Sequence, residues 1–163
     1  MATNILTNGS FNSVSSGIPN GWYFGAHYVE NSISGVQGEG ISLTPCIKAV
    51  ITRTVDPGMC YIHQGVIFHT GRQYRLSFWA KRSGNIDVWA AYQVGTQTTH
   101  LPSAISQLSS SSNVFSKVTY IINIPSQSAS QLTGSIMLIA GSATGTVWFD
   151  DASLEDAASE QNP

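Results

Sequence analysis

The stretch Tyr74-Arg75-Leu76-Ser77-Phe78-Trp79-Ala80-Lys81 decides the fold class. Its apolar side chains recur at every second residue, which is the period of a β-strand with one buried face. Residues 86–94 repeat this alternation, and Ser83-Gly84-Asn85 between the two runs predicts a tight hairpin turn. We expect the inward residues of both runs to be largely buried: Tyr74, Leu76, Phe78, Val88, Ala90 and Tyr92.

Period-two runs dominate the rest of the chain, and no stretch of ten or more residues has helical spacing. Further strands are predicted at residues 47–55, 61–68, 115–124, 135–140 and 146–154, with shorter ones near 5–6, 22–24 and 41–43. Residues 101–113 read as a loop with room for one helical turn. Many short strands separated by turns predict an all-β sandwich or barrel.

The composition indicates one domain of about 155 residues, since domains typically hold about 100–200. Residues 1–155 are expected to form it, and residues 156–163 a polar C-terminal arm. Charged residues make up only 10% of the chain and the net charge is −2, which disfavours nucleic acid as a partner. Nothing resembles a membrane span or a secretory signal, although a signal removed earlier is the open alternative.

Cys46 and Cys60 are expected to be buried free thiols. A hairpin turn at Asp56-Pro57-Gly58 would place Cys46 opposite Phe68 and leave the two cysteines too far apart for a disulfide.

No catalytic residue is predicted. The four histidines are scattered without metal-ligand spacing, and no nucleophile elbow is present. The few acids could in principle supply the carboxylate pair of a glycosidase, but turn and terminal positions account for most of them.

Two tryptophans are the better candidates for a functional surface. In the predicted hairpin, Trp79 faces Trp89 on the outer side, where the pair could stack against sugar rings. The flanking hydrogen-bonding groups would be Arg75, Lys81, Asp87 and Gln93. The alternative is that loops or a second sheet cover this face.

Three segments resemble the carbohydrate-binding modules of the family 4/9/22 type. They are Asn4–Phe11 with Pro19–Trp22, Gln64–Lys81, and Val147–Glu155. The resemblance implies a jelly-roll β-sandwich of two antiparallel sheets. It also implies a structural calcium ion at Asp150 or Asp151, although Asn12 stands where the opening motif often has Glu. Alternatively, these Asp side chains only bind turn backbone.

Two non-enzymatic functions follow. The first is decoration of a tailed-phage capsid, located on the virion, with the major capsid protein and other copies of the chain as partners. Contacts would come from polar arms: Met1, Ala2, Thr3, Asn4, Asp156, Gln161, Asn162 and Pro163. Low charge and hydroxyl-rich strands favour it. The alternative is an extracellular carbohydrate-binding module that targets a polysaccharide or cell-surface glycan.

Overall fold

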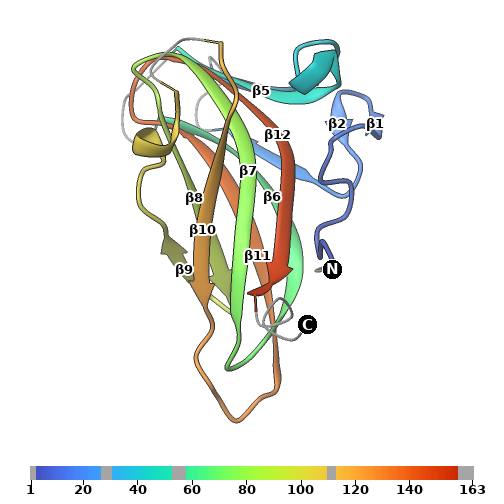
Figure 1. Cartoon of the computed structure of the whole chain (residues 1–163), viewed down its shortest axis with the longest axis vertical. Coiled ribbons are helices and arrows are strands. Elements are labelled where there is room, and N and C mark those ends of the chain that lie inside the picture. Colours follow the sequence, from blue (N-terminus) through green and yellow to red (C-terminus); the bar gives the residue numbers. More distant parts are fainter. Residues whose placement is uncertain (1–2, 27–30, 53–57, 110–112, 158–163) are drawn as a thin grey trace.

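Two five-stranded antiparallel sheets pack face to face in a computed structural model, which describes residues 3–26, 31–52, 58–109 and 113–157 (Figure 1). The front sheet, nearer the viewer, has the order β10-β7-β12-β5-β4, and the back sheet β3-β6-β11-β8-β9. The predicted all-β sandwich is therefore confirmed. A two-residue-per-strand hairpin, β1 with β2, lies outside both sheets.

The front sheet consists of β4 (Ser32–Val36), β5 (Cys46–Ile51), β7 (Gln73–Gly84), β10 (Ser116–Asn123) and β12 (Gly145–Asp156). The back sheet consists of β3 (Tyr23–Ala26), β6 (Met59–His69), β8 (Asp87–Val94), β9 (Gln97–His100) and β11 (Gln131–Gly141). The remaining elements are β1 (Val14–Ser15), β2 (Ile18–Pro19) and two 3₁₀ turns, η1 (Ile41–Leu43) and η2 (Ile105–Gln107).

The predicted core is confirmed. Tyr74 is 1% exposed, and Leu76 and Phe78 are fully buried between the sheets. Val88 and Ala90 are fully buried as well, while Tyr92 is half-buried near the end of β8. Burying a side chain of the size of Leu or Phe contributes about 1.5–3 kcal/mol, so this period-two face supplies much of the stability.

The predicted hairpin between residues 74–81 and 86–94 is wrong. β7 belongs to the front sheet and β8 to the back sheet, so the chain crosses from one sheet to the other after Gly84. Gly84 has a φ of +94° and pairs with Gly145 of β12, and Ile86 is fully buried where the chain crosses. Both arrangements bury the same apolar face, which is why alternation alone did not separate them.

The cysteines are free and buried, as expected, but for a different reason. Cys46 begins β5 in the front sheet and Cys60 lies on β6 in the back sheet, so Cys46 does not face Phe68 across a hairpin. Asp56 and Pro57 of the predicted turn lie outside the described residues. Burial raises the pKa of the Cys46 thiol to about 12 and that of Cys60 to about 11.

The N-terminal segment, residues 3–22, closes one open edge of the sandwich. β5 pairs with the first part of β12, residues 145–149, and the N-terminal segment lies beside the second part. There the Ile5 N–H donates to the Leu154 carbonyl at 2.7 Å. It reaches the back sheet through Gln64, whose side chain bonds both backbone groups of Thr7. No regular strand forms at residues 5–6, and residues 41–43 form η1 instead of the predicted strand.

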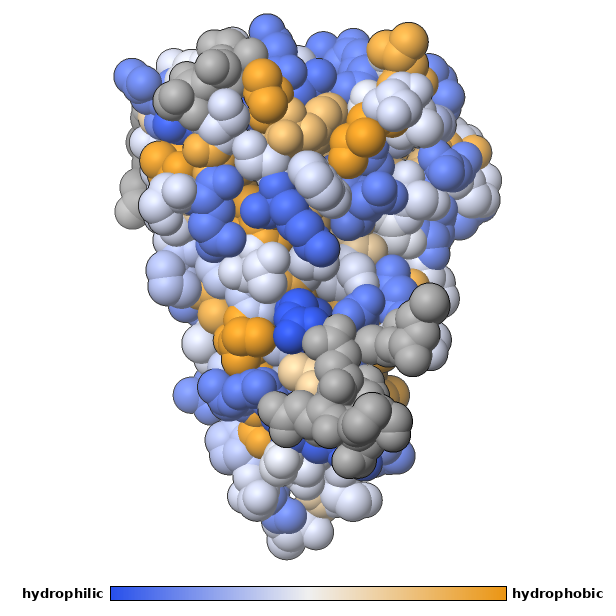
Figure 2. All heavy atoms as spheres, in the orientation of Figure 1, coloured by the Kyte–Doolittle hydropathy of each residue, from blue (hydrophilic) through white to orange (hydrophobic). Residues whose placement is uncertain are grey.

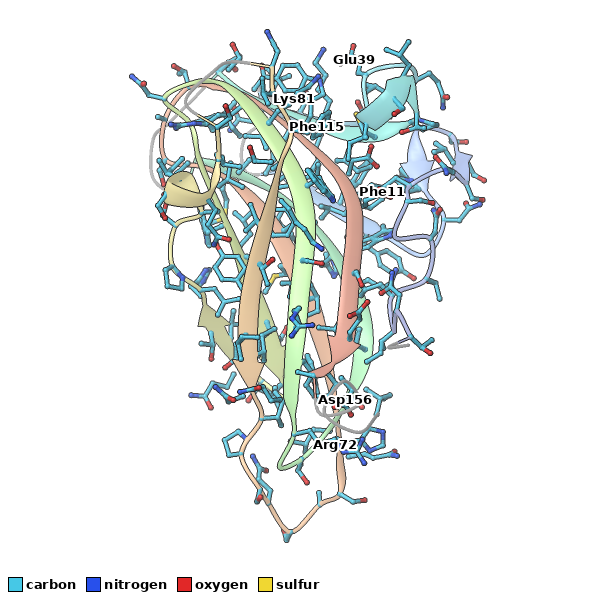
Figure 3. The ribbon with its side chains drawn as sticks, in the orientation of Figure 1. Phe11, Glu39, Arg72, Lys81, Phe115 and Asp156 are labelled. Carbon is cyan, nitrogen blue, oxygen red and sulfur yellow. The ribbon has the colours of Figure 1, made fainter. Side chains whose placement is uncertain are left out.

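The buried rings of Phe11, labelled in Figure 3, and Trp22 fill this edge of the core, and their centroids lie 5.2 Å apart. The first segment of the family resemblance, Asn4–Phe11 with Pro19–Trp22, therefore closes the core at this edge. At the other terminus β12 continues through Asp156, and Ala157 is only 7% exposed. Asp156, predicted to begin the polar arm, therefore belongs to β12, and residues 158–163 lie outside the described residues.

Candidate functional site

The outer face of the back sheet, called the back face below, gathers aromatic side chains at its β3–β6 side. Tyr23 is 65% exposed and lies directly opposite His63 in the strand register, with ring centroids 5.6 Å apart. Tyr61, two residues along β6, lies 5.8 Å from the same imidazole. Burial lowers the pKa of His63, so its ring is neutral at pH 7 and adds no charge.

A second aromatic group lies at the β8–β9 side of the back face. The Trp89 indole N–H donates to Nδ1 of His100 at 3.1 Å, which fixes both rings across the two strands. Asp87 accepts a hydrogen bond from Ser103 at 2.5 Å. These four side chains border a hollow of about 330 Å³.

Small and polar residues occupy the space beside the Tyr23 group. Gly65 on β6 pairs with Ser135 on β11, which in turn pairs with Gln93 on β8. Together with Tyr23 and His63 they line a hollow of about 360 Å³. These strand residues reach the outer face because every second residue of a strand points outward.

The back face carries little charge. No Lys or Arg occurs in the strands of the back sheet, and Asp87 is their only acid. Aromatic rings, amides, hydroxyls and imidazoles suit a ligand that has apolar faces and many hydroxyl groups.

The predicted tryptophan pair does not exist. Trp79 is on β7, opposite Lys117 and Asp150 in the front sheet, whereas Trp89 is on β8, opposite Ile139 in the back sheet. The six predicted surface residues therefore divide between the two outer faces of the sandwich: Trp79, Arg75 and Lys81 in front, and Trp89, Asp87 and Gln93 behind.

Sequence reasoning missed Tyr23, Tyr61, His63 and His100. The run Tyr61-Ile62-His63-Gln64-Gly65-Val66 does alternate, and its outward residues are aromatic or small. That pattern was sufficient to identify Tyr61 and His63 as outward-facing residues. Tyr23 and His100, in contrast, lie on four-residue strands with no clear alternation of their own.

On the outer face of the front sheet, called the front face below, the aromatic side chains contact charged residues of the same chain. The ammonium groups of Lys48 and Lys81 lie over the Trp148 ring, 5.4 and 4.8 Å from its centroid. Trp148 donates to Glu39 at 2.6 Å, and Glu39 pairs with Lys48 at 3.2 Å. Lys81 also lies 4.8 Å from the Phe115 ring (Figure 3). Figure 2 shows polar side chains spread over this face with hydrophobic ones scattered among them.

Asp150, predicted as a calcium ligand, is 1% exposed and surrounded by hydrogen-bond donors. Its Oδ2 accepts from the Ile41 N–H at 2.9 Å and lies 3.3 Å from the Thr44 hydroxyl, and its Oδ1 accepts from the Asp151 N–H at 2.8 Å. Burial raises the pKa of Asp150, and these backbone donors act against that increase.

These surroundings do not fit calcium, which takes about six to eight oxygen ligands. Asp151 is exposed, and the Gly9 carbonyl nearby already accepts the Ala152 N–H. Among the described residues, no three His, Cys, Asp or Glu side chains lie close enough to hold a metal ion. Asp150 instead ties η1 to the bulge in β12.

The predicted partner-contact arms are described only in part. Asn4 is bound to its own chain, since its side chain bonds both the Ala152 carbonyl and the Leu154 N–H. Asp156 pairs with Arg72 at 2.6 Å (Figure 3). Thr3 is exposed. Met1, Ala2, Gln161, Asn162 and Pro163 lie outside the described residues. Within the described ranges, no helix has the length and apolar character needed to cross a bilayer.

Comparisons with known proteins show similarity of fold. No family model matches the chain, and no curated protein matches its sequence. The CBM22-2 xylan-binding domain of Paenibacillus barcinonensis Xyn10C superimposes with a TM-score of 0.62 at 14% identity, over 91% of this chain and 98% of that one. This similarity confirms the predicted jelly-roll fold of carbohydrate-binding modules.

Proteins with other activities share the fold. A Stig cyclase from Fischerella sp. TAU, in complex with an indole compound, superimposes with a TM-score of 0.68 at 14% identity, over 95% of this chain and 98% of the cyclase. The enzymatically active domain of bacteriophage CBA120 tailspike protein 4 gives a TM-score of 0.62 at 14% identity, over 93% of this chain. The present chain spans about a fifth (21%) of that tailspike chain.

Proposed function

We propose that this protein is a non-catalytic carbohydrate-binding module that holds a neutral glycan on its back face. The observation that carries the proposal is the pair of aromatic groups, Tyr23 with His63 and Trp89 with His100, beside two hollows in which Asp87 is the one charged residue among the described lining residues. Sugar rings present C–H faces that pack on aromatic rings and hydroxyl groups that bond amides and imidazoles.

The size of the back face suits a chain of several sugar rings. Its five strands lie about 4.8 Å apart, so the two aromatic groups are separated by most of the width of the sheet, roughly 15–20 Å. The absence of Lys and Arg from these strands disfavours acidic polysaccharides, whose carboxylates need cationic partners.

Hydrolysis of the bound glycan is not part of the proposal. Glycosidases use two carboxyl groups about 5–10 Å apart, and the back-sheet strands contain only Asp87. One fold supports many activities, so the similarity of fold to the cyclase makes enzymatic activity the alternative to be tested.

Affinity electrophoresis and calorimetry with soluble xylan, galactan and glucomannan test the proposal, with polygalacturonate as the acidic comparison. We expect at least one neutral polysaccharide to bind, Tyr23→Ala to weaken that binding tenfold or more, and no reducing ends to be released. Ile121→Ala is the matched control, since Ile121 is 44% exposed on the front sheet. Equal loss in both variants, or release of reducing sugar, would contradict the proposal.

Capsid decoration stays a prediction. The similarity to a tailspike domain is one of fold, and Asn4 is already bonded within its own chain. Copurification with phage particles, followed by deletion of residues 158–163, would test it. The same copurification experiment would test whether the protein is located on a virion or outside a cell.

A further inference from the structure

A hollow of about 470 Å³ opens between the two sheets at the edge opposite the N-terminal segment. β9 and β10 are the edge strands on this side, one from each sheet. The loop that contains η2 covers part of the opening, where the Tyr120 hydroxyl donates to the Pro102 carbonyl at 2.5 Å and the Thr119 N–H to Gln107 at 2.8 Å. Beyond this loop, the slot between β9 and β10 stays open.

The floor of the slot is apolar. Tyr92 and Val94 reach it from β8, Leu132 from β11, and Ile124 and Pro125 from the chain after β10. Tyr92 packs against the buried Phe68, with ring centroids 6.4 Å apart, which fixes its position. The floor is therefore a rigid extension of the core.

The rim of the slot is polar and uncharged. Gln97 and Thr99 pair with Val94 and Tyr92 in the strand register, so they face into the sandwich from β9. Asn123 and Gln127 border the slot from the other side, and none of the described residues that line it is charged.

Most of these polar side chains have unused hydrogen-bond donors and acceptors. Asn123 is the exception: it follows the buried Ile122, so its side chain points to the outer side of the front sheet, where its oxygen accepts a hydrogen bond from Gln73 at 2.9 Å. The side chains of Tyr92, Gln97, Thr99 and Gln127 have no hydrogen-bond partner among the described residues.

We propose that this slot is a second binding site that takes one neutral sugar ring, the end of a glycan or a free monosaccharide. Its volume lies within the range of about 300–1,000 Å³ that is usual for small-ligand sites. A sugar ring matches it chemically, because its C–H face fits the floor of Tyr92 and Leu132 and its hydroxyls reach the amides of the rim. The proposal goes beyond glycan binding on the back face, since it uses different residues.

NMR titration of the intact chain with the methyl glycosides of xylose, galactose, glucose and arabinose tests the site, with indole as a separate probe. We expect one of the sugars to shift the amide signals of Thr99 and Asn123. Thr99→Phe fills the slot and should weaken this binding tenfold or more, about 1.4 kcal/mol. Thr98→Phe is the matched control, because Thr98 pairs with Gln93 and points to the other face of the same exposed strand.

The two sites are separable by variant. Tyr23→Ala should leave sugar binding in the slot unchanged, and Thr99→Phe should leave polysaccharide binding on the back face unchanged. Gln97→Ala, on the rim of the slot, provides a second disruption if Thr99→Phe fails to fold. Signal shifts with indole alone, no shifts with any sugar, or sugar binding that survives both slot variants would overturn the proposal.

Discussion

Trp148 on the front sheet and Trp89 on the back sheet both point outward from a long strand, yet their surroundings differ. Trp148 contacts two lysines and bonds a carboxylate, so its polar and aromatic capacity is used within the chain. Trp89 has one hydrogen-bond partner, His100, and borders a hollow. The comparison shows that an outward aromatic residue is available to a ligand where charged neighbours do not already occupy it.

The two faces also differ in what covers them. On the front face η1 and the N-terminal segment lie against β12, and Asp150 is buried beneath them. Among the described residues of the back sheet, Tyr23 and Ile67 stay substantially exposed, at 65% and 49%. Changes on the front face should therefore act on stability, and changes on the back face on binding.

The largest effect should come from Asp150→Ala. Removing this buried acceptor leaves the N–H groups of Ile41 and Asp151 without a partner, at a cost of about 1–3 kcal/mol each where they stay dry. Urea unfolding should show a loss of about 2–4 kcal/mol. Asp87→Ala, the half-exposed carboxylate of the back face, should lose less than about 1.5 kcal/mol. A larger loss from Asp87→Ala than from Asp150→Ala would contradict the assignment of roles.

Replacing each of the two tryptophans by alanine should affect different properties of the protein. Trp148→Ala removes two cation–π contacts and a hydrogen bond, so it should cost about 1–3 kcal/mol of stability and leave glycan binding intact. Trp89→Ala should weaken polysaccharide binding about tenfold with a smaller loss of stability. Calorimetric titration and thermal unfolding measured on both variants separate the outcomes, and a reversed pattern would assign the glycan to the front face.

A pH effect of smaller size is expected from the back face. Burial depresses the pKa of His63 in the folded chain, so the unfolded chain binds more protons in the window below the ordinary histidine pKa of about 6.5. Stability should therefore be complete above that pH and fall as the pH drops through the window. His63→Gln should flatten this part of the stability–pH curve, and an unchanged slope would show that another group titrates there.

Calcium should have the smallest effect. Because the Asp150 carboxylate already accepts backbone donors, adding calcium or a chelator should not shift the midpoint of thermal unfolding. A rise in the midpoint with calcium that Asp150→Asn abolishes would restore the family-type metal site.

The sequence predicted most strands from alternation, and the structure confirms the long ones to within a few residues. β4 and β9 were missed because Ser32–Val36 and Gln97–His100 carry few apolar residues. Both are edge strands, each with one hydrogen-bonded neighbour, so their strand form depends on pairing more than on their own pattern.

The candidate site was predicted only in part. Trp89, Asp87 and Gln93 do lie on the back face, but Trp79, Arg75 and Lys81 were assigned to it through a hairpin that does not form. Tyr23 and His63, which are far apart in the sequence, meet because β3 pairs with β6.

Which side chains point inward follows from the sequence, because alternation is a local property of each strand. The core around Leu76 and Phe78 and the all-β class follow from this alternation. Which sheet each strand joins, and so whether Trp79 and Trp89 share a face, is seen only in the folded chain. The reason is physical: an inward apolar face is buried equally well by a hairpin or by a crossing between sheets. Long-range strand pairing selects between them.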